Sequence, residues 1–195
     1  MKVELLDSTV DPLFVVSKCA RTCYQSEDKD ELKKREGFIR GLIKSKHESP
    51  LEFMWTVWDI KGISRVCLSQ LTRHRIASYC VESQRYCDTS ENDCVIPVKA
   101  LCVDDSCVDF VKKAKEFYKK LVLAGVPKED ARYFLPIGTT CNLKVGMNLR
   151  ELRSFFKLRL DRHAQWEIRL LAKEMYNIIK EKWRAHEDSN LGHTA

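Results

Sequence analysis

The chain has 195 residues, of which 44% are hydrophobic, and a formal net charge of +6 at pH 7. This length suffices for one domain with a substantial core, and the hydrophobic content is ordinary for a globular protein. Because no run of about 18 apolar residues occurs, the sequence predicts no transmembrane helix. The positive charge favours anionic ligands, which leaves nucleotides, folates, flavin phosphates and nucleic acid open.

Hydrophobic periodicity predicts the elements of the first two thirds of the chain. Residues 30–46 place apolar side chains on one face and Lys, Glu and Arg on the other, which predicts an amphipathic helix. The segment 53–60 is rich in aromatic and β-branched residues and predicts a strand that ends at Gly62. Further helices are expected at residues 64–72, 105–124 and 128–134.

The last third is predicted as a strand followed by long helices. Residues 139–145 read as the strand, and the next helix begins near Asn148. Phe155 and Arg159 are four residues apart, beside the apolar stripe of that helix, which puts Arg159 at the edge of a packed face. A final helix is expected over residues 163–183, and the tail at 190–193 is too polar to pack.

Nine cysteines are many for this length, but their number is odd and no Cys-x-x-Cys pair occurs. The chain also shows no signal peptide with an apolar core, so we expect reduced thiols in a cytoplasmic protein. Cys80, Cys87 and Cys94 are seven residues apart. Zinc ligands usually lie two to four residues apart, so we expect no metal site.

A dense basic cluster occupies residues 73–85. It combines the guanidiniums of Arg73, Arg75 and Arg85 with the His74 imidazole and the Ser83 hydroxyl. Arginine suits phosphate because its planar fork donates two parallel hydrogen bonds and stays charged. Short basic clusters are usually solvated surface, but the predicted helix before this one would hold it in a fixed place. The sequence therefore favours an anion site.

Three motifs resemble those of the flavin-dependent thymidylate synthases. The sequence RHRIASYCVES at 73–83 resembles that family's RHR-x7-S signature, and HESPLE at 47–52 is similar to its H-E-[ST]-P-x-E segment. The sequence LRLDRHAQWEI at 158–168 is similar to its L-R-x-x-x-H-A-Q-x-E-I helix. The likeness also includes CAR at 19–21 and EDAR at 129–132, so it covers most of the chain.

The resemblance implies an enzyme that converts dUMP to dTMP. Methylenetetrahydrofolate would supply the one-carbon unit, FAD would carry the hydride, and NADPH would regenerate the reduced flavin. It also implies a homotetramer whose active sites are shared between subunits. With the predicted elements, we expect one α+β domain over residues 1–195, with a small, mostly antiparallel sheet packed against several helices and long C-terminal helices. Neither a nucleic acid nor a membrane is an expected partner.

The resemblance assigns two sets of residues. Those expected to hold FAD are Ser49, Arg73, His74, Arg75, Asn148, Arg150 and Ser154, with His47 also beside the flavin ring. Those expected to hold dUMP are Gln70, Arg73, Glu82, Ser83, Gln84, Arg85, Arg132 and Arg159. The candidate catalytic residues are Arg159, Ser83 and His47.

Arg159 matches the family arginine that contacts the uracil. A guanidinium beside O2 and N3 would stabilise negative charge in the ring and make C5 a better nucleophile without an enzyme adduct. His163, four residues later, could orient it. Ser83, or one of the nearby Cys80 and Cys87, could instead be a nucleophile. A serine needs an adjacent base, and His74, nine residues away in the sequence, is not shown to contact Ser83, so Ser83 is preferred as a phosphate ligand.

Several positions depart from the family pattern. Cys80 and Val81 stand where a polar pair is common, Cys23 replaces a serine and Phe53 a histidine. Ser154 stands where a larger side chain often meets the flavin adenine. One alternative is therefore a relative that binds dUMP but has lost flavin turnover. Another is a basic nucleic-acid-binding module that stacks bases on exposed aromatics such as Tyr79 and Tyr86.

Overall fold

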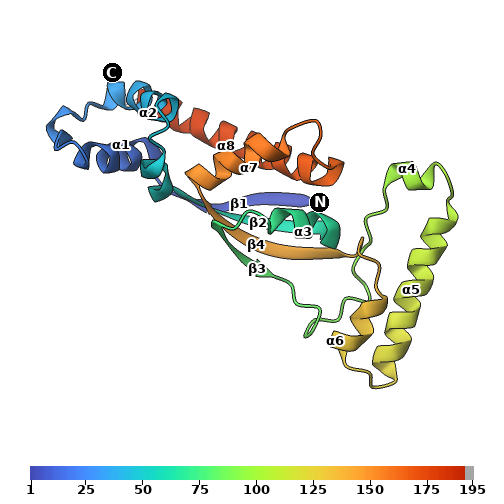
Figure 1. The fold of residues 1–195 in the computed structure, drawn as a ribbon. Coiled ribbons are helices and arrows are strands. Elements are labelled where there is room, and N and C mark those ends of the chain that lie inside the picture. Colours follow the sequence, from blue (N-terminus) through green and yellow to red (C-terminus); the bar gives the residue numbers. More distant parts are fainter. Residues whose placement is uncertain (192–195) are drawn as a thin grey trace. The chain divides into compact units, whose positions relative to one another are not determined.

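The computed structural model describes residues 1–191, with side chains as far as Trp183. Strands and helices alternate along the chain (Figure 1). Their bounds are β1 (Lys2–Ser8), α1 (Pro12–Thr22), α2 (Arg35–Lys44), β2 (Trp55–Ser64), α3 (Arg65–Leu71), β3 (Ala77–Val81), α4 (Val98–Leu101), α5 (Ser106–Leu123), α6 (Lys128–Ala131), β4 (Thr140–Asn148), α7 (Leu149–Arg159) and α8 (Trp166–Leu191).

The four strands form one antiparallel sheet in the order β1-β2-β4-β3, which confirms the expected α+β class. By its packing the chain divides into two compact units. The first unit contains Met1–Lys2, Ile60–Arg73 and Tyr79–Lys144, and the second contains Val3–Asp59, His74–Ser78 and Val145–Ala195. Strands β2 and β4 each contribute residues to both units.

The second unit has a core built by α1, α2 and the short 3-10 helix Ser49–Phe53. Its fully buried members are Val16, Ile39, Leu51 and Met54, with partly buried side chains such as Trp183 packed against them. Helices α1 and α7 begin at capping side chains. Asp11 accepts a hydrogen bond from the Phe14 backbone N–H at 2.9 Å ahead of α1, and Asn148 caps α7 in the same way.

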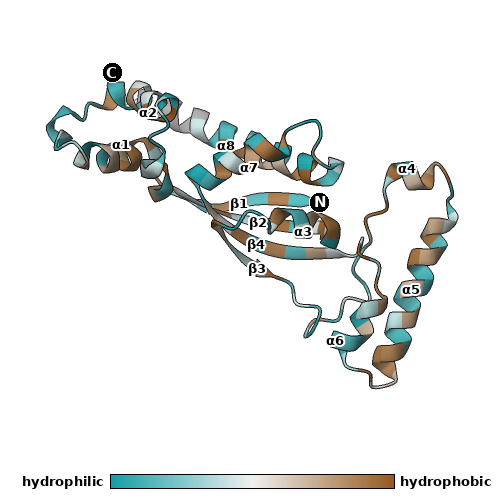
Figure 2. Ribbon diagram, in the orientation of Figure 1, coloured by the Kyte–Doolittle hydropathy of each residue, from teal (hydrophilic) through white to brown (hydrophobic). Residues whose placement is uncertain are grey.

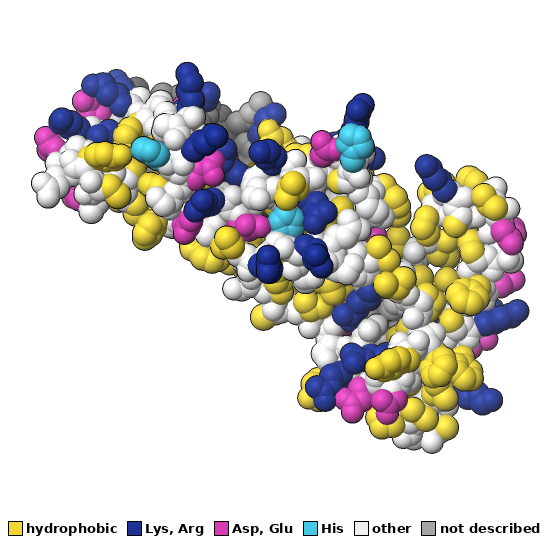
Figure 3. Space-filling view, viewed as in Figure 1, with side chains coloured by type: hydrophobic (Ala, Val, Ile, Leu, Met, Phe, Trp, Pro, Cys, Tyr) yellow, Lys and Arg dark blue, Asp and Glu magenta, His cyan; other side chains and the backbone are white. Residues whose placement is uncertain are grey.

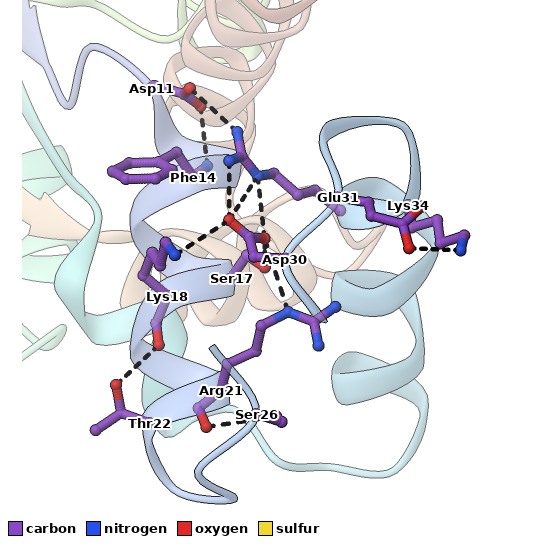
Figure 4. Close-up of polar contacts among 11 residues, drawn as sticks. Asp11, Phe14, Ser17, Lys18, Arg21, Thr22, Ser26, Asp30, Glu31 and Lys34 are labelled. Carbon is purple, nitrogen blue, oxygen red and sulfur yellow. Dashed lines mark hydrogen bonds and ion pairs between the residues drawn. The ribbon is translucent and has the colours of Figure 1, made fainter. Parts of the chain in front are cut away.

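A charged cluster in the second unit ties the loop before α2 to α1. The Asp30 carboxylate accepts hydrogen bonds from Ser17 at 2.7 Å and from Arg35 at 2.8 Å. Figure 4 shows it lying also beside Lys18 and Arg21, whose nitrogens are 3.8 and 3.7 Å away. These cations lower the pKa of Asp30 to about 2, with the Arg35 hydrogen bond as the main cause.

The first unit carries helices α3 to α6. Its longest helix, α5, shows hydrophobic and hydrophilic positions side by side along its length (Figure 2). Tyr118 is fully buried, and Phe117 packs edge-on against Phe134 with ring centroids 5.0 Å apart. Other apolar side chains of α5 lie on the surface, where Figure 3 shows hydrophobic groups gathered. Phe110 is 67% exposed and Leu123 is 83% exposed.

Most of the predicted elements are present, with different boundaries. The strand predicted to end at Gly62 continues to Ser64, and Gly62 within it adopts a φ of 72°, which glycine tolerates without a steric penalty. The helix predicted at 30–46 is shorter, since a 3-10 turn precedes α2. Strands β1 and β3 and helix α1 were not predicted. The expectation about the tail at 190–193 lies outside the described side chains.

None of the helices within residues 1–191 is long and apolar enough to cross a membrane. The nine cysteines all lie in the described part of the chain, and none of them forms a disulfide there. Over the same part of the chain, no group of three or more His, Cys, Asp or Glu side chains is arranged to hold a metal ion.

Candidate functional site

The first unit brings Ser83, Arg85 and Arg132 together around Glu129. Arg85 Nε donates to the Glu129 carboxylate at 2.8 Å, and Arg132 Nε donates to the Glu129 carbonyl oxygen at 3.0 Å. The Ser83 hydroxyl oxygen accepts from the Arg85 backbone N–H at 3.2 Å. Figure 3 shows acidic and basic side chains adjacent over α6. Both guanidiniums therefore share Glu129 as a partner, and guanidiniums of this kind can bind a phosphate.

Glu82 makes several hydrogen bonds within the first unit, and its expected contact with dUMP stays a prediction. Its carboxylate accepts from the side-chain nitrogens of Asn92 at 2.8 Å and Asn142 at 2.9 Å, and from the Asn142 backbone N–H at 3.1 Å. Its carbonyl oxygen accepts from Arg65 at 2.9 Å. These four bonds fasten the end of β3 to its surroundings, so Glu82 fixes the start of the segment that carries Ser83.

Helix α3 delivers the first basic residue of the motif. Ser64 caps α3, and the Gln70 carbonyl oxygen accepts from the Arg73 backbone N–H at 3.4 Å just beyond the helix end. The Arg73 side chain is exposed and that of Gln70 is half-buried, as is that of Gln84. Tyr79 is half-buried and donates its hydroxyl proton to the Leu71 carbonyl at 2.9 Å, so it is not the exposed stacking platform considered above.

In the second unit, His47 and Ser49 line a cavity of about 300 Å³ together with Cys23 and Arg150. The positive φ of Lys46, 62°, turns the chain there, and the His47 backbone N–H donates to the Leu42 carbonyl at 2.9 Å. Arg150 forms ion pairs with Glu52 and, more distantly, with Glu48. The structure therefore places three of the expected flavin residues at one cavity.

A larger groove of about 1,100 Å³ lies in the same unit, and Arg150 lines it as well. Its walls come from α1, α2, α7 and α8, and they include the expected flavin residues Asn148 and Ser154. Apolar and aromatic side chains such as Trp183 line it together with basic ones such as Lys157 and with the carboxylates of Glu36, Glu48, Glu52 and Glu151. Asn148 is buried and uses its side-chain oxygen to accept from the Glu151 backbone N–H at 2.9 Å.

His74 connects the arginine-rich motif to α7. Its Nε2 accepts a hydrogen bond from Arg159 Nε at 3.1 Å, and its Nδ1 lies 2.8 Å from Glu151 Oε1. The ring packs edge-on against Phe155, with centroids 5.1 Å apart, and only 4% of the residue is exposed. Because Nε2 accepts, the proton of the neutral ring lies on Nδ1 and is donated to Glu151.

The charge state of His74 follows from these neighbours. Burial lowers the pKa of His74, the hydrogen bond to Glu151 acts in the opposite direction, and the Arg159 charge lowers it again. His74 is therefore neutral at pH 7. His74 is buried and Arg75 is exposed, and the expected contacts of both with FAD stay predictions.

The expectation that His163 orients Arg159 is wrong. His163 Nδ1 lies 2.8 Å from Asp161 Oδ1, and both side chains are exposed. Sequence reasoning also missed Glu151. The signal was available, because Asn148 followed by Glu151 has the spacing of a helix capping box, in which the carboxylate turns back toward the cap. Here the Glu151 carboxylate reaches His74 instead.

Two of the cysteines have thiols whose protonated form is favoured by burial. Burial raises the pKa of the Cys94 thiol and that of Cys19, which keeps both protonated at neutral pH. The Ser83 hydroxyl accepts a backbone N–H, which suits a turn-forming and ligand-binding role.

Comparison with known proteins identifies the family. The sequence model described as "Thymidylate synthase complementing protein" matches residues 4–183. The chain belongs to this family. A flavin-dependent thymidylate synthase of Geobacter sulfurreducens is 40% identical over 192 residues, which cover 92% of this chain and 82% of that protein.

Two solved structures share the fold. The UMP/dUMP methylase PolB from Streptomyces cacaoi, crystallised with 5-Br dUMP, superposes with a TM-score of 0.80 at 29% identity, over 92% of this chain and 90% of the other. Thymidylate synthase X from Helicobacter pylori, crystallised with FAD and dUMP, superposes with a TM-score of 0.76 at 29% identity, over 91% and 92%. The protein is therefore an enzyme of the flavin-dependent thymidylate synthase family.

Proposed function

We propose that this chain catalyses the reductive methylation of dUMP to dTMP with FAD, with methylenetetrahydrofolate as the one-carbon donor and NADPH as the reductant. The observation that carries the proposal is the fixed guanidinium of Arg159, which is held through Nε by the buried, neutral His74. A charge-stabilising group for a pyrimidine ring has to be held in this way.

The lining of the large groove in the second unit supports the proposal that FAD binds there. Its large groove offers apolar and aromatic walls, including Phe156 and Trp183, that suit flat rings. Arg150 and Lys157 line the same groove and can pair with a pyrophosphate. His47 and Ser49 line the smaller cavity, which shares Arg150 with the groove. When bound, the reduced flavin supplies the hydride that completes the methyl group, and NADPH restores it.

We assign the phosphate of dUMP to Ser83, Arg85 and Arg132 of the first unit, in which both guanidiniums contact Glu129. Glu129 now neutralises Arg85, so phosphate would replace this exposed carboxylate as the partner of the guanidinium. Exchange of one exposed anion for another costs little, because pairs of this kind contribute at most about 1 kcal/mol. Gln70, Arg73 and Gln84 remain expected contacts to the nucleotide.

Arg159 then acts on the uracil without a covalent enzyme nucleophile. Negative charge that spreads over O2 and N3 is stabilised by the guanidinium, and C5 becomes the nucleophile that accepts the one-carbon unit. The Ser83 hydroxyl serves as an acceptor in its turn, which fits a phosphate ligand better than an attacking group.

We also propose a homotetramer with shared active sites. Phe110 and Leu123 of α5 are both exposed, together with other apolar side chains of that helix such as Val108. A second copy of the chain would cover them. Sedimentation of the purified protein tests this, and a fully active monomer would contradict it.

Removal of the Arg159 guanidinium tests the function. Arg159→Ala should lower the turnover number by about 100-fold or more, as loss of a charge-stabilising donor does, while FAD binding, followed by flavin absorbance, stays unchanged. Arg162→Ala is the matched control, because Arg162 is exposed and follows closely in the sequence. Equal losses of turnover and flavin affinity in the Arg159 variant would contradict the assigned role.

A further inference from the structure

We infer that His74 is a positioning residue for Arg159, acting through a hydrogen-bonded relay that begins at Glu151. This inference rests on the proposed role of Arg159 at the uracil. It gives the histidine of the RHR motif a task inside the protein, in place of the flavin contact that the family resemblance implies.

The relay has three members and two hydrogen bonds. Glu151 Oε1 accepts from His74 Nδ1 at 2.8 Å, and His74 Nε2 accepts from Arg159 Nε at 3.1 Å. Glu151 and Arg159 both belong to α7, so the imidazole bridges two positions of one helix. With 4% of His74 exposed and both ring nitrogens bonded to protein groups, little of the ring is accessible to a ligand.

The bond from Nε fixes the orientation of the guanidinium. An arginine side chain has several rotatable bonds and loses up to about 2 kcal/mol of conformational entropy when it is held in one rotamer. Nε lies at the base of the planar group, so an acceptor there sets the plane in which the terminal nitrogens lie. The position of the guanidinium matters for turnover, because a misplacement of a catalytic group by about 1 Å can lower the rate about 100-fold.

Glu151 fixes which nitrogen of His74 carries the proton. If the proton were on Nε2, two donors would face each other and Arg159 would lose its acceptor. The charged groups facing the ring, Glu151 and Arg159, both come from α7, and Phe155 covers one edge. Burial and the Arg159 charge lower the pKa of His74, which keeps the ring neutral and able to accept.

Two isosteric variants separate the two nitrogens. In His74→Gln the amide oxygen can stand at the Nε2 position and accept from Arg159, whereas in His74→Asn the amide stands at the Nδ1 position and Arg159 loses its acceptor. We expect His74→Asn to lower kcat by about 10- to 100-fold and His74→Gln by less than about fivefold. FAD affinity should change by less than about twofold in both.

A double-mutant cycle shows whether His74 acts through Arg159. In the Arg159→Ala background, His74→Asn should have no further effect on kcat, because the group that it positions is gone. Should His74→Asn fail to fold, Glu151→Ala tests the other end of the relay and should give the same pattern. An equal loss of kcat in both backgrounds, or a loss of FAD affinity with kcat unchanged, would overturn the inference.

Histidine 15N NMR tests the contact apart from the reaction. The wild-type protein should show His74 as the Nδ1–H tautomer, and its Nε2 resonance should shift in Arg159→Ala. If wild type forms no dTMP but shows this tautomer, the proposed function fails and the relay stands. An Nε2–H tautomer would overturn the relay whatever the activity.

Discussion

Replacement of Asp30 by asparagine should lower the free energy of unfolding strongly, although Asp30 lies in a loop. The carboxylate faces Lys18, Arg21 and Arg35, and its side chain is only 3% exposed. Its pKa falls from 3.8 to about 2, a drop of just under two units. At about 1.4 kcal/mol per unit, the carboxylate contributes about 2 kcal/mol to the free energy of unfolding.

The pH dependence of this effect has a definite sign. The folded-state pKa of Asp30 lies below its unfolded value, so its stabilisation is complete above pH 3.8 and is lost as the pH falls through about 2. Urea unfolding, followed by tryptophan fluorescence at fixed protein concentration, should show a gap of about 2 kcal/mol between wild type and Asp30→Asn at pH 7. About half of that gap should remain at pH 3.

Glu31→Gln is the matched control. Glu31 pairs with Lys34 in the same loop, but both side chains are more than half exposed, and Figure 4 shows this pair apart from the Asp30 cluster. Its loss should cost at most about 0.5 kcal/mol. If Asp30→Asn costs no more than Glu31→Gln, or if its cost stays constant down to pH 3, the reasoning is refuted.

Three further substitutions test other contacts. Thr56→Val should lower the free energy of unfolding by about 1 to 3 kcal/mol. The Thr56 hydroxyl donates to the Met147 carbonyl oxygen at 3.0 Å and accepts from the Trp58 indole at 2.9 Å. Thr56→Ser keeps the hydroxyl and should retain most of the wild-type stability. Gly138→Ala should lower the melting temperature, since its Cβ would lie 2.7 Å from a backbone oxygen, and an unchanged melting temperature would show that the segment adjusts freely. Ser83→Ala should raise KM for dUMP with residual kcat in a steady-state assay, whereas complete inactivity at saturating dUMP would favour the nucleophile interpretation.

Long periodic elements could be predicted from the sequence, and short ones could not. Helix α5 lies within one residue of its predicted bounds, because its apolar spacing extends over 18 residues. Strand β1 contains adjacent Leu5 and Leu6, which obscure the alternation of a strand. Helix α1 begins with Asp11 as its N-cap and Pro12 in its first turn, a pattern that indicates a helix start.

The motifs of the candidate site could be identified from the sequence, but the contacts between them could not. The RHR motif and the α7 helix were both identified, yet their link through His74 joins positions 85 residues apart. Separation of this size leaves no local signal in one sequence. His163 was the nearer choice in sequence, but it lies on an exposed turn with Asp161. His74 is buried and contacts Arg159, whereas His163 is exposed, and a single sequence does not show which histidine the fold buries.

Formation of dTMP in a single turnover tests the central claim most directly. The protein is loaded with FAD, reduced anaerobically with NADPH and mixed with dUMP and methylenetetrahydrofolate, and the nucleotides are separated by chromatography. The account predicts about one dTMP per bound flavin, with none when dUMP, the folate or the reductant is omitted. Reduced flavin and bound dUMP without dTMP would contradict it and would identify a relative that binds its ligands but has lost the reaction.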